Sequence, residues 1–349
     1  MMPVKPMPAS QAANDDNADS AANELRIIRD ALCHAPELHA KTRIQPVADL
    51  VNSKPAAADV YGSPGDDCAA FASGAGYQLL AIEGMLPWFV KNDPWAAGWS
   101  AVMANVSDVA AMGGRATSVV NAYWHHDQAQ ADLIMQGIQN ACDVFGITLA
   151  GGHTNMSMSH QASLAVAVMG FATHLLSCRH LQPGQPLYMA VDLNGQWHGD
   201  NNYWNVLSGK QREQVRSMWD LLPQLAEAGL VTAAKDISNG GVLGTLLMML
   251  ELNSLGVRID IDAIPRPEDE VDVIRWLKAF QSYGFLLTGP EQHSHEVEQY
   301  FDTHGLTCKI IGTITEEPAV IFGRADASLE FWNLGQTPLT GMSLAKRGQ

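Results

Sequence analysis

The sequence has few cysteines and no long apolar run. Its five cysteines are scattered and none belongs to a CxxC pair, which argues against a disulfide framework and favours a reducing compartment. No apolar run reaches the roughly 18 residues of a membrane span, and the N-terminal segment has no apolar signal-peptide core. We therefore expect a cytoplasmic protein without a signal peptide or a membrane partner.

Basic residues are also scarce. The chain carries 21 Lys and Arg against 37 Asp and Glu, a formal net charge of −16. An acidic surface repels nucleic-acid backbones and anionic membranes, so neither is expected as a partner. Anionic small molecules are not excluded, because metal ions, backbone N–H groups and helix N-termini can hold a phosphate.

Several common catalytic motifs are absent as well. The chain has no GxxxxGK[ST] loop, no GxGxxG after a strand and no GxSxG elbow, which would mark a P-loop, a dinucleotide fold or an α/β-hydrolase. The segment HEVEQY (295–300) is not HExxH, so a zinc-protease site is excluded. What is present is a chain of 349 residues, 47% hydrophobic and 17% charged, which predicts a globular protein of two domains.

Composition divides this chain into three parts. Residues 1–22 are rich in Ala, Asn, Asp and Ser without an apolar period, and they are predicted to be a disordered tail. We predict a first domain over 23–173 and a second over 174–345, with the boundary in the segment 172–186.

Strand and helix patterns alternate through the first domain. A helix is expected from Pro94, with Asp93 as its N-cap and Gly113 and Gly114 at its end. The other elements expected here are helices over 23–32 and 128–145, and strands at 68–71, 77–83, 117–123, 147–152 and 163–171. Strands covered by helices on one face predict an α+β layer.

The second domain shows the same alternation. Apolar periods predict helices over 205–229, 241–255, 268–280 and 291–303. The expected strands lie at 183–192, just before 236–241, and at 257–262, 284–289, 307–314 and 318–323.

Acidic residues stand at the ends of several of these apolar elements. Asp66 and Asp67 follow a tight turn, Glu83 ends a strand, and Asp108 lies near the end of an apolar helix. Carboxylates beside buried segments are costly unless they are paired or bind a cation, and Mg²⁺ prefers oxygen ligands. Each residue taken alone also fits a plainer role, as a turn cap, a strand-end charge or a solvated helix residue.

Two glycine-rich turns are candidates for phosphate binding. In LAGGHTN (149–155) a strand runs into Gly-Gly, whose backbone N–H groups can approach a ligand closely. His153 in this turn fits a phosphate donor, a metal ligand or an ordinary loop histidine. In DISNGG (236–241) a strand ends at Asp236 before an apolar helix, whose N-terminus favours anions, although Ser238 or Asn239 there also fits a simple helix cap.

Taken in order, these segments resemble the aminoimidazole ribonucleotide (AIR) synthetase superfamily, which includes thiamine-monophosphate kinase and selenophosphate synthetase. GDDCAAF (65–71) is similar to the family's GDDAA, and NVSDVAAMGG (105–114) to its NxSDxAAMGA helix. LAGGHTN, DISNGG and IGTIT (311–315) are similar to later family segments, so the resemblance covers roughly residues 60–323.

The resemblance implies a two-domain α+β fold, with a ferredoxin-like N-terminal domain whose sheet is covered by helices, followed by an α/β C-terminal domain. It implies ATP and Mg²⁺ between the domains, a small-molecule acceptor, and a homodimer through the N-terminal sheets. By position, it implies metal ligands at Asp66, Asp67, Glu83 and Asp108, catalytic roles for Asp108, Asp236 and His153, and cofactor contacts at Asn105, Gly113, Gly151, Gly152, Thr154, Ser238 and Asn239.

The chain departs from each single subfamily. Thiamine-monophosphate kinases have Asp where His153 and Asn239 stand, and the Cys-Gly-x-Lys of selenophosphate synthetase has no match. Two functions are therefore expected: an ATP- and Mg²⁺-dependent phosphotransferase or ATP-activating synthetase for a small metabolite, or a non-catalytic nucleotide-binding regulatory protein. In the first case, the loops 87–93 and 196–212 are expected to select the acceptor.

Overall fold

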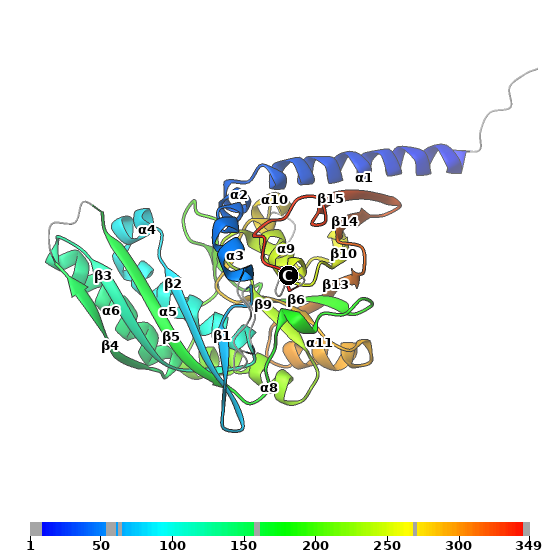
Figure 1. Cartoon of the computed structure of the whole chain (residues 1–349). Helices are drawn as coiled ribbons and strands as arrows, with labels where there is room; N and C mark the ends of the chain where they lie inside the picture. The colour runs from blue at the N-terminus through cyan, green and yellow to red at the C-terminus, as the bar shows by residue number, and fades with distance from the viewer. Residues whose placement is uncertain (1–8, 54–60, 62–64, 157–160, 268–270, 345–349) are drawn as a thin grey trace, which may run out of the picture.

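The computed structural model describes residues 9–53, 61, 65–156, 161–267 and 271–344. Two sheets, each packed against helices, lie side by side, and the long helix α1 (Ala9–Cys33) runs across the second (Figure 1). The mixed α+β, two-domain fold expected from the sequence is confirmed. No helix within the described ranges is long and apolar enough to cross a membrane.

The N-terminal sheet has the strand order β1-β2-β5-β3-β4. Its strands are β1 (Ala69–Ser73), β2 (Gly76–Gly84), β3 (Arg115–Trp124), β4 (Thr148–Asn155) and β5 (Ser163–Ala172). Its helices are α4 (Pro87–Asn92), α5 (Pro94–Ala111) and α6 (Gln128–Phe145). Each strand and helix predicted for this sheet is present, with bounds shifted by a few residues.

Helix α5 packs on the N-terminal sheet and against α6. Its N-cap Asp93 accepts a hydrogen bond from the backbone N–H of Ala96, and from Ser100 to its end every residue is buried. Gly98 on α5 and Gly137 on α6 let the two backbones touch, because a Cβ on either glycine would collide with the other helix. Because α5 is buried and closely packed, the position of Asp108 near its end is fixed.

No helix among the described residues covers the other face of this sheet. Leu80 pairs with Met169, and Ile82 pairs with Ala167, which pairs in turn with Val120. Because side chains alternate between the faces of a strand, these residues all point away from α5 and α6. Leu80 and Ile82 are 50% and 68% exposed, so the sheet presents an uncovered apolar face.

The C-terminal sheet has the strand order β15-β14-β10-β13-β6-β12-β9. Its strands are β6 (Pro186–Val191), β9 (Ala233–Asp236), β10 (Gly256–Asp260), β12 (Gly284–Thr288), β13 (Thr307–Thr315), β14 (Ala319–Arg324) and β15 (Ala327–Asn333). A small sheet combines β7 (Gln196–Trp197), β8 (Tyr203–Asn205) and β11 (Phe280–Gln281). The helices are α7 (Arg212–Trp219), α8 (Leu221–Glu227), α9 (Gly241–Glu251), α10 (Val273–Leu277) and α11 (Ser294–Asp302), with short 3-10 turns at Cys178–His180, Ile261–Ala263 and Glu291–His293.

Several expectations for this half need correction. The single helix expected over 205–229 is wrong. Asn205 ends strand β8, and the helical part is divided at Asp220 into α7 and α8. The helix expected over 268–280 covers only α10, and residues 268–270 lie outside the described residues. The sheet is mostly antiparallel, since only β10 and β14 pair in parallel, so the α/β label implied for this domain fits it only loosely.

The N-terminal segment is more ordered than the composition suggests. Helix α1 begins at Ala9, within the range 1–22 expected to be a tail, and residues 1–8 lie outside the described residues. Its later turns pack on β14 and β15, where Glu24 pairs with Arg324, so this helix joins the second sheet rather than the first. Two further helices that the pattern did not predict follow it, α2 (Pro36–Thr42) and α3 (Gln45–Asn52).

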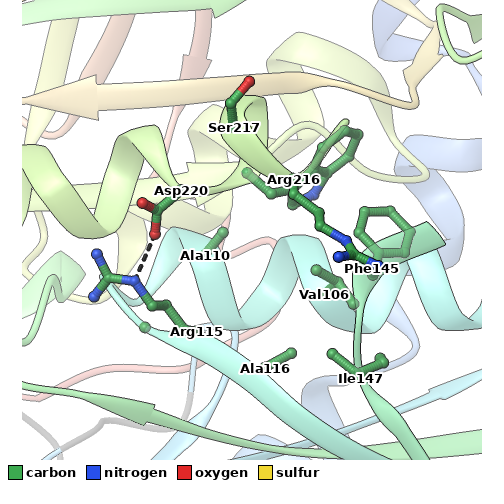
Figure 2. Close-up of a pocket in the computed structure, with 11 residues that line it drawn as sticks. Val106, Ala110, Arg115, Ala116, Phe145, Ile147, Arg216, Ser217 and Asp220 are labelled. Carbon is green, nitrogen blue, oxygen red and sulfur yellow. Dashed lines mark hydrogen bonds and ion pairs between the residues drawn. The ribbon is translucent and has the colours of Figure 1, made fainter. Parts of the chain in front are cut away.

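The two halves meet beside α5. Arg115 of β3 forms ion pairs with Asp220 and Glu227 in the second half. A cavity of about 320 Å³ lies between α5 and α7, and Figure 2 shows the Arg115–Asp220 pair on its wall. The residues that line it include none of the predicted site residues, so this cavity is separate from the site described next.

Candidate active site

Three aspartates from separate parts of the chain converge beside α5. Side-chain oxygens of Asp67, Asp108 and Asp236 all lie within 4.8 Å of one another. The whole residues Asp108 and Asp236 and the side chain of Asp67 are each only 6% exposed. The sequence analysis selected all three residues, and the structure brings them together.

Each aspartate is held by a different element. Asp67 lies two residues before β1, Asp108 lies in the last turns of α5, and Asp236 ends β9. The backbone N–H of Asp236 donates a hydrogen bond to Asp67 Oδ2 at 3.3 Å. The site therefore lies where the first sheet, helix α5 and β9, an edge strand of the second sheet, meet.

Burial and mutual repulsion make this cluster costly to ionise. Burial raises the pKa of Asp108 well above its usual range, and the charges of Asp236 and Glu83 raise it further. Burial likewise raises the pKa of Asp236, with an added contribution from Asp67. Burial also raises the pKa of Glu83 on β2, and the negative charge of Asp67 adds to this shift.

A buried lysine offsets part of this negative charge. Lys235 Nζ forms an ion pair with Asp67 Oδ1 and donates a hydrogen bond to the carbonyl of Gly65 at 3.0 Å. Burial alone would lower the pKa of Lys235, but the charge and hydrogen bond of Asp67 and the nearby charge of Asp236 act together against burial, and the net shift is upward. Lys235 therefore stays charged, but its single charge does not balance the four carboxyl groups, counting Glu83.

The donor set fits a hard divalent cation. All three converging groups are carboxylates, and burial raises the pKa of each of them, so a cation bound there would stabilise their charged forms. Asn105, one turn before Asp108, is fully buried and donates to the carbonyls of Ala101 and Val166. Its Oδ1 has no partner among the described residues. A buried site made of three carboxylates is suited to Mg²⁺.

Two other predicted residues serve the connection between the halves. Asp66 points to the segment after β5, where it accepts hydrogen bonds from Ser177 Oγ at 2.6 Å and from the backbone N–H of Cys178 at 2.8 Å. Gly113 ends α5 with φ +76°, and a Cβ there would press on the carbonyl of His174. Both residues fix the linker, and neither joins the three-aspartate cluster.

The predicted phosphate loop lies elsewhere. Gly151, Gly152, His153 and Thr154 are exposed residues of β4, which is the edge strand opposite β1. At about 4.8 Å per strand, β4 is roughly 19 Å from β1. His153 pairs with Ala122, so it points to the uncovered face, with its ring 6.2 Å from that of Trp124. Within one chain, this loop does not meet the carboxylates.

The turn before α9 does meet them. Ser238 and Asn239 lie two and three residues after Asp236. Neither caps the helix, because Gly240 is the N-cap residue and makes no side-chain cap hydrogen bond. Gly240 and Gly241 both have positive φ, which only glycine adopts without strain. The N–H of Gly241 donates to the carbonyl of Ser238 at 3.0 Å. The next two N–H groups of α9 have no partner among the described residues and are open to a ligand.

Sequence reasoning missed two lysines at this site. Lys235 lies in the apolar stretch LVTAAKDI (230–237), where a charge inside a strand was an available signal. Lys41 on α2 lies in a segment that carried no signal. Burial lowers the pKa of Lys41, and the charge of Lys235 lowers it further. The negative charges of Glu83, Asp236 and Asp67 raise it.

The sequence matches two family models that together cover most of the chain. Residues 65–172 match the N-terminal domain of AIR synthase related proteins, and residues 192–323 match the C-terminal domain. The chain belongs to the AIR synthase related family. The three aspartates come from both matched domains, so the cluster is a feature of their joint fold.

One relative in this family covers most of the chain. The uncharacterized protein sll0787 of Synechocystis sp. is 41% identical over 280 residues, which is 80% of this chain and 86% of that protein.

Solved structures share the fold at lower identity. Thermotoga maritima PurL complexed with ATP aligns with a TM-score of 0.68 at 18% identity, over 85% of this chain and 49% of PurL. AaThiL complexed with AMPPCP and TMP aligns with a TM-score of 0.59 at 16% identity, over 77% of this chain and 92% of that one. This chain therefore spans about half of PurL and nearly all of AaThiL.

Proposed function

We propose that this protein is an ATP- and Mg²⁺-dependent phosphotransferase or ATP-activating synthetase that acts on a small metabolite. The observation that carries the proposal is the convergence of Asp67, Asp108 and Asp236 within 4.8 Å. Solved relatives of the same fold were crystallised with ATP and with an ATP analogue, which supports nucleotide binding at such a site.

The residues of the chain have separable tasks in this proposal. Asp67, Asp108 and Asp236 would hold Mg²⁺, which bridges phosphate oxygens and neutralises their charge when it is bound. The free N–H groups at the start of α9 would bind phosphate oxygens. Lys235 holds Asp67 in place, and the buried α5 keeps Asp108 from moving, so the site is preorganised for charge stabilisation.

The test is calorimetric titration of the full chain with a non-hydrolysable ATP analogue, with and without Mg²⁺. We expect binding that requires Mg²⁺, because the carboxylates repel a bare triphosphate. Absence of heat at millimolar nucleotide with Mg²⁺ would contradict the proposal. Phosphate release from ATP, measured across a panel of small metabolites, would then identify the acceptor.

The alternative is a nucleotide-binding regulatory protein without transfer chemistry. The Lys235–Asp67 ion pair favours it, because one of the three carboxylates is already neutralised within the chain. His153 also lies far from the cluster along the sheet. Tight Mg²⁺-nucleotide binding with no phosphate release for any metabolite in the panel would favour this reading over the enzyme.

We also propose a homodimer formed through the uncovered face of the N-terminal sheet. An exposed apolar sheet face is a typical interaction surface, and His153 points to it. We expect Ile82→Lys to shift the mass measured by light scattering from a dimer to one 37.7 kDa chain. Val47→Lys, on an equally apolar but separate exposed site of α3, is the control. A monomeric wild-type protein would contradict the dimer.

A further inference from the structure

Lys41 belongs to a part of the chain outside both family domains, yet it reaches their shared site. Helix α2, which carries it, packs on the first turn of α9. A Cβ placed on Gly240 would lie 3.4 Å from Lys41 Cε, and one on Gly244 would lie 3.7 Å from Leu38 Cδ1. Since residues four apart share one face of a helix, α2 rests on a glycine face of α9. The N-terminal segment therefore delivers Lys41 to the turn that follows Asp236.

The ammonium group of Lys41 has no partner of its own. In the parts of the chain that the structure describes, its Nζ makes no hydrogen bond or ion pair. Lys235, by contrast, is bound to Asp67 and to the carbonyl of Gly65. An ammonium ion has three donors, and holding one half-buried without an acceptor is costly. Lys41 is thus the cation at this site that is still available to a ligand.

We propose that Lys41 contacts a phosphate oxygen of the bound nucleotide, so that the segment before the first family domain completes the site. Two features of the turn support this role. After Gly241, whose N–H is bonded to the carbonyl of Ser238, the next two N–H groups of α9 have no partner among the described residues. The positive end of the helix favours the same anion. This inference rests on the proposed function, because it requires a phosphate ligand at the carboxylate cluster.

The test compares Lys41→Met with Arg43→Met in the full chain. Arg43 is exposed, two residues further along the same segment, so its loss changes the charge without touching the site. Titration with Mg²⁺ and a non-hydrolysable ATP analogue should show roughly 10–100-fold weaker binding for Lys41→Met, as expected for a lost charge-assisted contact. Arg43→Met should bind as the wild type does, and Lys41→Arg should recover part of the affinity.

A second measurement uses the unmodified protein. Brief acetylation of lysines, read by mass spectrometry, should label Lys41 in the apo protein and be blocked by the Mg²⁺-bound analogue, while labelling of the exposed Lys309 stays constant. Protection of Lys41 from acetylation tests its contact with the nucleotide even if Lys41→Met fails to fold.

The outcomes separate the two proposals. Wild-type binding together with unchanged affinity in Lys41→Met and no protection of Lys41 would overturn the role of Lys41 and leave the proposed function intact. That result would assign Lys41 to charge balance with Glu83 alone. A wild-type protein that binds no Mg²⁺-nucleotide would overturn both proposals.

Discussion

Asp108→Asn should make the apo protein more stable and its Mg²⁺-nucleotide complex much weaker. Burial raises the pKa of Asp108, and the negative charges of Asp236 and Glu83 raise it further. Removing that charge relieves repulsion, and we expect a gain of about 1–3 kcal/mol in unfolding free energy without metal. Nucleotide affinity should fall by at least the roughly 10–100-fold that even outer-shell metal contacts provide.

The pH dependence gives this prediction a second signature. A carboxyl group whose pKa is raised in the folded state holds protons that the unfolded chain releases, so stability falls as pH rises above about 4. Urea unfolding in EDTA should therefore show a decline from pH 5 to pH 8 in the wild type and a smaller one in Asp108→Asn. Mg²⁺ should stabilise the wild type more at pH 8 than at pH 5, because protons compete with the metal for the same oxygens.

The control for Asp108→Asn is Asp302→Asn, at the exposed end of α11. It should change neither stability nor nucleotide binding. A variant at Asp108 that lost stability in EDTA, or that bound the nucleotide normally, would show that this aspartate is a structural residue.

The local sequence was sufficient for the elements around Asp108. Asp93 and Pro94 mark the start of α5, and Gly113 marks its end, because capping depends on a few neighbouring residues. Asp67 was selected as a carboxylate beside a buried segment, which is costly without a partner or a cation, and Asp236 was noted as the end of a strand before a glycine turn. Motif resemblance then joined three segments that no local pattern connects.

What the local sequence could not place depends on strand order, which is not local. LAGGHTN reads as a phosphate loop, but β4 is placed at the far edge of the sheet by its pairing with β3. Asp66 and Asp67 are neighbours, yet one holds the linker and the other joins the site. Helix α2 had too short a pattern to predict, and Lys41 matters only because α2 packs on glycines far along the chain.

Lys235→Met should be the most damaging single substitution at this site. It removes the buried cation bound to Asp67 and leaves Asp67, Asp108 and Asp236 without that neighbour. Breaking a buried ion pair from one side costs about 3–5 kcal/mol, because the remaining charge is unpaired in a low-dielectric interior. Thermal and urea unfolding in EDTA should show this loss, and it should be greater at pH 8 than at pH 5 because the carboxylates are more fully ionised.

The double variant Lys235→Met/Asp67→Asn separates charge from packing. If the cost is the unpaired carboxylate, removing it should restore most of the stability, as replacing both partners of a buried pair is often nearly neutral. Mg²⁺ should also raise the melting temperature of Lys235→Met more than that of the wild type, since the metal supplies the missing charge. Lys309→Met, at an exposed lysine, is the control for the substitution itself. No rescue by either route would mean that the Lys235 side chain stabilises the fold by packing, and that the three carboxylates do not bind a cation.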